Sequence, residues 1–133
     1  MVVRRLFDTN TALYLLGDRL AEPLASGEYF VSVITEMELL SYPSLEAQQE
    51  AQIQSFLNKV TIVNLNSEIK RFAIELRRAR KLKLPDAIIV ATAMAIEAEL
   101  LTNDQKLQLI PRRNRENTSA ERAFGVNLSH LLL

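Results

Sequence analysis

Short apolar runs and helical apolar spacings alternate along this chain. Runs of strand length, several rich in β-branched residues, occur at 2–7, 29–33, 60–65 and 100–102. The stretches between them carry apolar residues three and four positions apart, which is the spacing of one helix face. The clearest case includes Ile69, Phe72, Ala73 and Leu76. This alternation predicts an α/β fold whose parallel sheet carries helices on both faces.

Capping and turn residues indicate the bounds of the first two helices. Asn10 can cap the first helix, and Gly17 can stop it. The second helix starts at Ser32 or Thr35 and ends before Pro43, because the residue before a proline disfavours helical geometry.

Three further helices are expected. One follows from residue 44, and the next is capped by Asn66. Pro85 suits the first turn of the last one, which covers 86–99. That helix is apolar nearly all round, so we expect it to be buried on most sides.

The pattern weakens after residue 107. Residues 111–120 are polar and basic and predict an exposed loop, 123–128 could form a last strand, and the apolar residues 131–133 need a packing partner. The length of 133 residues predicts a single domain, residues 1–133.

Four acidic residues change this picture, because each lies beside the end of an expected strand or the start of an expected helix. They are Asp8, Glu38, Asp86 and Asp104. Parallel sheets bind ligands beyond the carboxyl ends of their strands, where the strand order reverses, and all four can reach that place. Clustered carboxylates repel one another unless a cation joins them. Hard oxygen ligands of this kind suit Mg²⁺ or Mn²⁺.

Each acid also has a purely structural explanation. Asp8 and Asp104 are common turn residues, and Asp86 would be favoured at a helix N-terminus. Glu38 could complete a capping box that starts at Thr35. Glu36 competes with Glu38 for the crevice, and the helical periodicity does not decide between them.

Composition excludes several kinds of chemistry. The chain has no Cys and a single His, His130, so thiolate sites, a Cys nucleophile, a His-rich zinc site and a His-centred triad are not expected.

Neither a signal peptide nor an apolar run of membrane-spanning length is present, which predicts a cytoplasmic protein without a membrane partner.

Basic residues balance the acidic ones, at 16 each, so bulk charge does not favour a nucleic acid. A local run nevertheless precedes Asp86: Arg77, Arg78, Arg80, Lys81 and Lys83. A solvated helix face is its ordinary explanation, and a phosphate-contacting patch is its functional one. A second, looser patch consists of Arg112, Arg113 and Arg115.

Three segments resemble the PIN-domain family, most closely the VapC-type toxins of toxin–antitoxin pairs. They are LFDTNTALYLL, SVITEMELLSY and LKLPDAIIVATAMAIEAELLTND, and they span Leu6 to Asp104. The order and spacing of the last segment are the most specific feature. Leu107 stands where this family commonly has an aromatic residue, and 111–133 is unlike its usual short ending.

The resemblance implies a three-layer α/β/α fold with a mainly parallel sheet of four or five strands. It implies a Mg²⁺-dependent endoribonuclease, Mn²⁺ being possible, with Asp8, Glu38, Asp86 and Asp104 as catalytic and metal-binding residues. The family's glutamate, followed by Leu, falls on Glu38 and not on Glu36. Asn10 and Thr102 match polar positions beside the metal. Implied partners are an RNA substrate, a cognate antitoxin protein and a second copy of the chain.

Other functions remain open at this point. A PIN nuclease of RNA maturation, outside any toxin pair, would look similar, and a non-cleaving module that binds RNA or protein is another alternative. A phosphoryl-accepting domain with Asp8 as the nucleophile would need a nearby lysine, for which Lys106 is the candidate.

Overall fold

The computed structural model describes residues 2–17, 26–104 and 107, and every element below lies within them. In chain order the elements are β1 (Arg4–Phe7), α1 (Thr9–Gly17), β2 (Glu28–Ser32), α2 (Val33–Leu40), α3 (Ala47–Lys59), β3 (Thr61–Val63), α4 (Ser67–Ala79), α5 (Leu84–Ala95) and β4 (Glu99–Leu101).

The strands of the described residues form one parallel sheet in the order β3-β2-β1-β4. Leu6 pairs with Phe30 and Leu100, whereas the next residue, Phe7, pairs with Val31 and Leu101. Successive strand residues face opposite sides, so these two rows form the two apolar faces of the sheet. The chain runs outward from β1 to β3 and then places β4 on the other side of β1. The strand order therefore reverses at β1.

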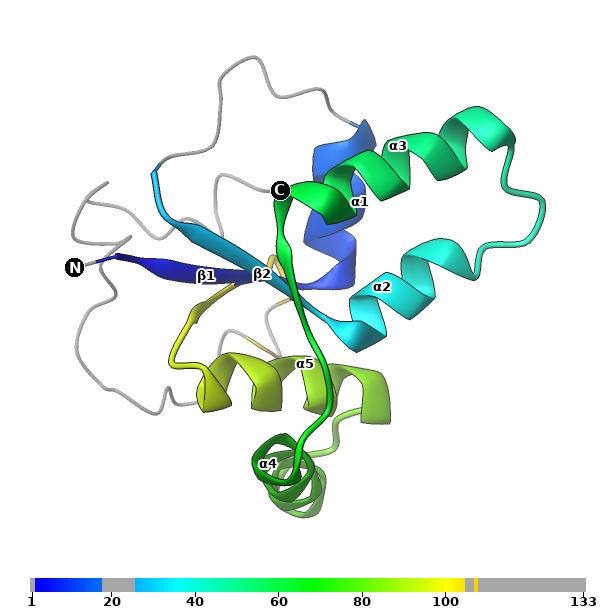
Figure 1. Ribbon diagram of the computed structural model, residues 1–133. Coiled ribbons are helices and arrows are strands. Elements are labelled where there is room, and N and C mark those ends of the chain that lie inside the picture. Colours follow the sequence, from blue (N-terminus) through cyan, green and yellow to red (C-terminus); the bar gives the residue numbers. More distant parts are fainter. Residues whose placement is uncertain (1, 18–25, 105–106, 108–133) are drawn as a thin grey trace.

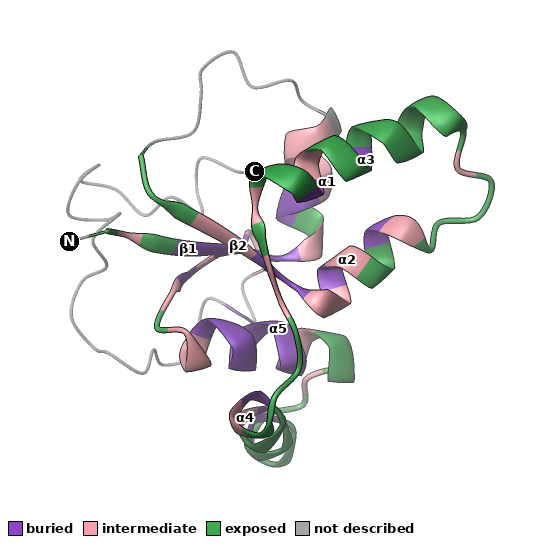
Figure 2. Cartoon of the chain, viewed as in Figure 1, coloured by how far each residue is buried: buried purple, intermediate pink, exposed green. Residues whose placement is uncertain are grey.

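Helices cover both faces of this sheet (Figure 1). Residues of α1, α2 and α3 pack with Phe7 and Val31 in one core, while α4 and α5 build the core on the opposite side. Residues 87–93 of α5 are all buried, as expected for a helix that is apolar on every side (Figure 2). The predicted three-layer α/β/α fold is thereby confirmed. No helix in the described part of the chain is both long and apolar enough to cross a membrane.

Several predicted bounds move once the structure is known. α1 begins at Thr9 directly after Asp8, so Asp8 and not Asn10 occupies the capping position. α3 begins at Ala47 instead of residue 44, because Glu46 and Gln49 form a reciprocal capping box. α5 begins two residues before 86 and ends at Ala95, which releases residues 99–101 to pair with β1. The last strand expected at 123–128 lies outside the described residues.

A charged side chain, Arg5, is buried on the central strand β1, toward the amino ends of the strands. Arg5 is 2% exposed, and its Nη1 donates to the Ser26 carbonyl and the Tyr29 hydroxyl, each at 3.2 Å. Gly27 lies beside it with φ of 154°, and a Cβ there would come within 2.9 Å of both Arg5 Nη1 and the Val3 carbonyl oxygen. Glycine therefore allows the chain that enters β2 to pass close to β1.

Candidate functional site

The candidate site lies at the carboxyl ends of β1 and β4, where the strand order reverses. Asp8 follows β1 directly, and Thr102 follows β4. Their strands are hydrogen-bonded neighbours, and the Asp8 amide donates to the Leu101 carbonyl at 3.3 Å. A reversal point of this kind leaves a crevice that adjacent helices do not close. The prediction that Asp8 and Asp104 meet at one edge of the sheet agrees with this topology.

Asp8 is buried, with 3% of its surface exposed, and both carboxylate oxygens accept hydrogen bonds. Oδ1 accepts from the Thr11 amide at 2.7 Å, which caps α1, and Oδ2 accepts from the Thr102 hydroxyl. Thr11 also anchors the helix to β4, since its hydroxyl donates to the Leu101 carbonyl at 3.0 Å. These contacts fix the Asp8 carboxyl group and compensate the burial of its polar atoms.

Thr102 connects Asp8 with Asp104. While its hydroxyl donates to Asp8 Oδ2, the same oxygen accepts from the Asp104 amide at 3.0 Å. Leu107 also holds Asp104, because its amide donates to the Asp104 carbonyl at 3.1 Å and its side chain is buried in the core of α4 and α5. An aliphatic residue at 107 therefore serves as the anchor of the loop that carries Asp104.

Glu38 is exposed on α2, and its carboxylate is held by a row of hydroxyls. The Thr9 hydroxyl donates to Glu38 Oε1 at 2.7 Å and lies 3.0 Å from the Thr35 hydroxyl. Thr9 has one hydroxyl hydrogen, so donation to Glu38 leaves Thr35 as the donor to Thr9. The proposed capping box at Thr35 is wrong, because Ser32 is the N-cap of α2 and Thr35 is fully buried inside the helix.

Asp86 lies in the first turn of α5, and burial and charge both act on it. Burial raises the pKa of its carboxyl group, and repulsion from Asp104, Glu38 and Asp8 raises it further. Lys83, at the N-cap position of α5, acts in the opposite direction. The other three acids are therefore near enough to Asp86 to oppose its ionisation. Glu36, on the same helix as Glu38, is not among the groups that act on it.

The donor set is suited to a hard divalent cation. It consists of carboxylates with neighbouring hydroxyls, as Mg²⁺ and Mn²⁺ prefer, and the mutual repulsion at Asp86 is what a cation would relieve. As the side chains stand, no three His, Cys, Asp or Glu residues in the described ranges are arranged to hold a metal ion. Mg²⁺ keeps several of its waters, so a site with few direct protein ligands is compatible with this spacing.

Sequence reasoning missed the hydroxyls that hold the acids. Thr9, Thr11 and Thr35 all contribute, and Thr102 was singled out only through the family resemblance. Their signal in the sequence is weak: two threonines just after Asp8, and one threonine in α2 between Ile34 and Glu36. Of the basic residues, 77, 78, 80, 81 and 83 are exposed, and 112, 113 and 115 lie outside the described part of the chain.

The fold and the site define a parallel α/β/α protein in which Asp8 and Asp104 lie beyond two neighbouring strands at the strand-order reversal. A model of the PIN domain matches residues 5–113. The chain therefore belongs to the PIN-domain family, and the family predicted from its motifs is confirmed.

The chain is also similar to several solved structures. The chain is 34% identical to a chain of a toxin–antitoxin complex from Klebsiella pneumoniae, with a TM-score of 0.65 over 79% of this chain and 90% of that one. The fold is shared with VapBC2 from Rickettsia felis bound to a promoter DNA fragment, at 22% identity and a TM-score of 0.73 over 82% and 94% of the two chains. It is also shared with VapBC-1 from nontypeable Haemophilus influenzae, at 22% identity and a TM-score of 0.66 over 80% and 90%. No curated protein matches this chain.

Proposed function

We propose that this protein is a Mg²⁺-dependent endoribonuclease and the toxin component of a toxin–antitoxin pair. The observation that carries the proposal is the hydrogen-bonded link from Asp8 through the Thr102 hydroxyl to the Asp104 amide at the strand-order reversal, beside which burial and repulsion from the other three acids raise the pKa of Asp86. A protein keeps such repulsion at a cost in stability, which is typical of a functional site. Membership of the PIN-domain family and the toxin–antitoxin relatives support the nuclease interpretation.

Each acid has a distinct role in this proposal. Asp8 and Asp86 would be the principal metal ligands, and Glu38 and Asp104 would complete or orient the metal's shell, partly through water. A bound Mg²⁺ supplies Lewis acidity, lowering the pKa of a coordinated water and neutralising charge on the phosphate. The chain supplies orientation: Thr102 holds Asp8 relative to Asp104, and Thr9 holds Glu38. Defined orientation of such groups contributes to rate because it is established before the reaction.

The structure disfavours Asp8 as a covalent nucleophile. Its carboxylate is buried and both oxygens accept hydrogen bonds, so neither has free access to an incoming phosphoryl group. A metal can still use a second lone pair on either oxygen. Lys106, the lysine that the alternative required, lies outside the described residues.

The proposed partners rest partly on a relative and partly on the family resemblance. One chain of a toxin–antitoxin complex from Klebsiella pneumoniae is 34% identical to this chain. This similarity supports an antitoxin protein as a partner of the present chain. RNA as substrate and a homodimer as assembly rest on the family resemblance. A cognate antitoxin would inhibit the protein by covering the acidic crevice.

The test is cleavage of a labelled RNA by the purified protein with Mg²⁺, with chelator, and with the variant Asp86→Asn. We expect chelator to abolish cleavage. Asp86→Asn should reduce it by more than about 100-fold, beyond the usual effect of losing an outer hydrogen-bond partner of a metal ligand. Glu38→Gln should also impair cleavage, whereas the matched change Glu36→Gln on the same helix should not. Cleavage that survives both chelator and Asp86→Asn would disprove the proposal.

A further inference from the structure

A strongly basic segment is hidden by the zero net charge of the chain. Residues 70–83 carry seven basic residues and one acidic residue, Glu75, which gives this segment a net charge of +6 and the remainder −6. Every one of the seven is exposed. Glu75 is occupied by Arg71 in an ion pair at 3.6 Å. The remaining six basic residues form what we call the basic strip: Lys70, Arg77, Arg78, Arg80, Lys81 and Lys83.

The strip follows α4 and ends at Lys83, which acts on the carboxyl group of Asp86 in the candidate site. On α4, Lys70 precedes Arg77 and Arg78 by seven and eight positions, or two helical turns, so the three lie on the same side of the helix. The next members occupy the connection to α5, and Lys83 stands at the N-cap of α5 only three residues before Asp86. The strip is therefore continuous in the chain with the candidate site.

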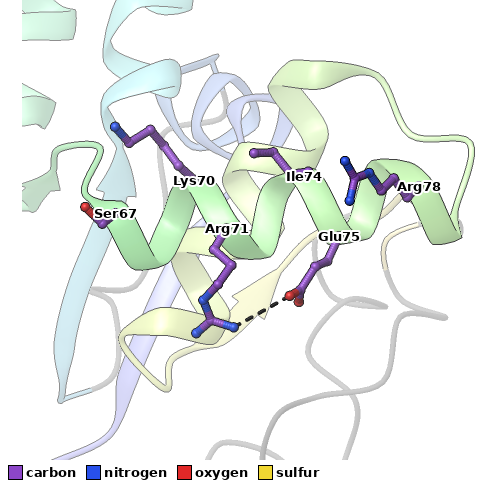
Figure 3. Close-up of a pocket in the computed structure, with 6 residues that line it drawn as sticks. All are labelled: Ser67, Lys70, Arg71, Ile74, Glu75 and Arg78. Atoms are coloured by element: carbon purple, nitrogen blue, oxygen red, sulfur yellow. Dashed lines mark ion pairs between the residues drawn. The ribbon is translucent and has the colours of Figure 1, made fainter.

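The outer surface of α4 is also hollowed. A hollow of about 450 Å³ is lined, among the described residues, by side chains of α4 alone: Ser67, Lys70, Arg71, Ile74, Glu75 and Arg78. Figure 3 shows Lys70 and Ile74 projecting to one side of the helix and the Arg71–Glu75 pair to the other. Ile74 is 53% exposed between these charges, which provides an apolar contact beside cationic ones.

We propose that the basic strip binds the sugar–phosphate backbone of single-stranded RNA and leads it to the acidic crevice. The inference rests on the proposed nuclease function. The candidate site gathers acidic side chains, so the affinity for a polyanion must come from cations beside it. Phosphate contacts by Lys and Arg supply such affinity without reading sequence. The strip carries one sign of charge only, whereas exposed helix faces laced with salt bridges alternate the two signs.

The test measures RNA binding separately from cleavage. Binding of a fluorescein-labelled single-stranded RNA is followed by anisotropy in chelator, over a series of salt concentrations, for the full-length protein. Removal of one phosphate-binding cation should reduce the slope of log affinity against log salt by about 0.7. We therefore expect reduced slopes for Lys81→Gln and for the double variant Arg77→Gln/Arg78→Gln. Lys59→Gln, which removes the same charge from the exposed end of α3, is the matched control and should bind as the unaltered protein does.

The outcomes separate this inference from the proposed function. Equal slopes for Lys81→Gln and Lys59→Gln would overturn it, because bulk charge would then explain the binding. Binding of polyglutamate in preference to RNA would also overturn it and make the strip a protein-docking surface. If Mg²⁺-dependent cleavage occurs but the strip variants keep the KM of the unaltered protein, the inference fails and the nuclease stands. If the strip binds RNA but no cleavage occurs, the nuclease proposal fails instead.

Discussion

Thr102 is the residue whose replacement tests the geometry of the site most sharply. Thr102→Val keeps the size and shape of this 1% exposed side chain but removes its hydroxyl. Two hydrogen bonds disappear with it, one to the Asp8 carboxylate and one from the Asp104 amide. A bond to a charged group contributes about 1.5–3 kcal/mol and a neutral one about 0.5–1.5 kcal/mol. We expect the free energy of unfolding to fall by roughly 2–4 kcal/mol.

The assay is urea unfolding in chelator, with Thr102→Ser as the control. Serine retains the hydroxyl and lacks a buried methyl group, which should cost about 1 kcal/mol. Thr102→Val should therefore be the more destabilising of the two, although it is the better match in volume. If valine is tolerated as well as serine, the hydroxyl does not hold Asp8 and Asp104 together, and the proposed geometry of the site is wrong.

Three other features of the structure can be tested by single substitutions. Asp86→Asn should stabilise the metal-free protein at neutral pH. The folded pKa of Asp86 lies above its ordinary value of 3.8, so the wild-type carboxyl group favours folding below pH 3.8. It loses this contribution to stability as the pH rises through the folded pKa. The advantage of the variant in urea unfolding should grow over that range, and a pH-independent difference would contradict the repulsion. Thr9→Val should lower the rate of RNA cleavage about fivefold, which is the effect of losing one hydrogen bond of about 1 kcal/mol, whereas Thr9→Ser should keep the original rate. Equal cleavage rates for the two variants would show that Glu38 does not depend on the Thr9 hydroxyl. Gly27→Ala should lower stability by about 1–3 kcal/mol in thermal unfolding, because the added Cβ would lie 2.9 Å from atoms of Arg5 and Val3. The control is Glu28→Ala at the exposed neighbouring position. An unchanged melting temperature for Gly27→Ala would refute the close approach.

The elements and layers could be predicted because they depend on local periodicity. The spacing of Ile69, Ala73 and Leu76 follows from the α4 face that they bury, and the all-round apolar pattern of 87–93 follows from its place between the sheet and α4. Bounds were less predictable where two residues could serve as caps. Asp8 takes that role over Asn10 because its carboxylate reaches the Thr11 amide.

The support of the acids could not be predicted, because it depends on contacts between elements far apart in sequence. Glu36 and Glu38 are only two residues apart, but the Thr9 hydroxyl donates to the carboxylate of Glu38. Thr9 lies 29 positions from Glu38 in the sequence, so no local pattern reveals this contact. Nothing in the sequence marks Arg5 as buried either. Its position depends on Tyr29 and on the close passage of Gly27.

Four carboxylates from separate parts of the chain are proposed to form a site for divalent metal, and calorimetric titration of the metal-free protein is the sharpest test of that proposal. We predict that Mg²⁺ or Mn²⁺ binds the unaltered protein and the Glu36→Gln control with equal affinity. Binding should weaken in Glu38→Gln and be abolished in Asp86→Asn. Metal binding by Asp86→Asn at the affinity of the unaltered protein would show that the four acids do not form a metal site.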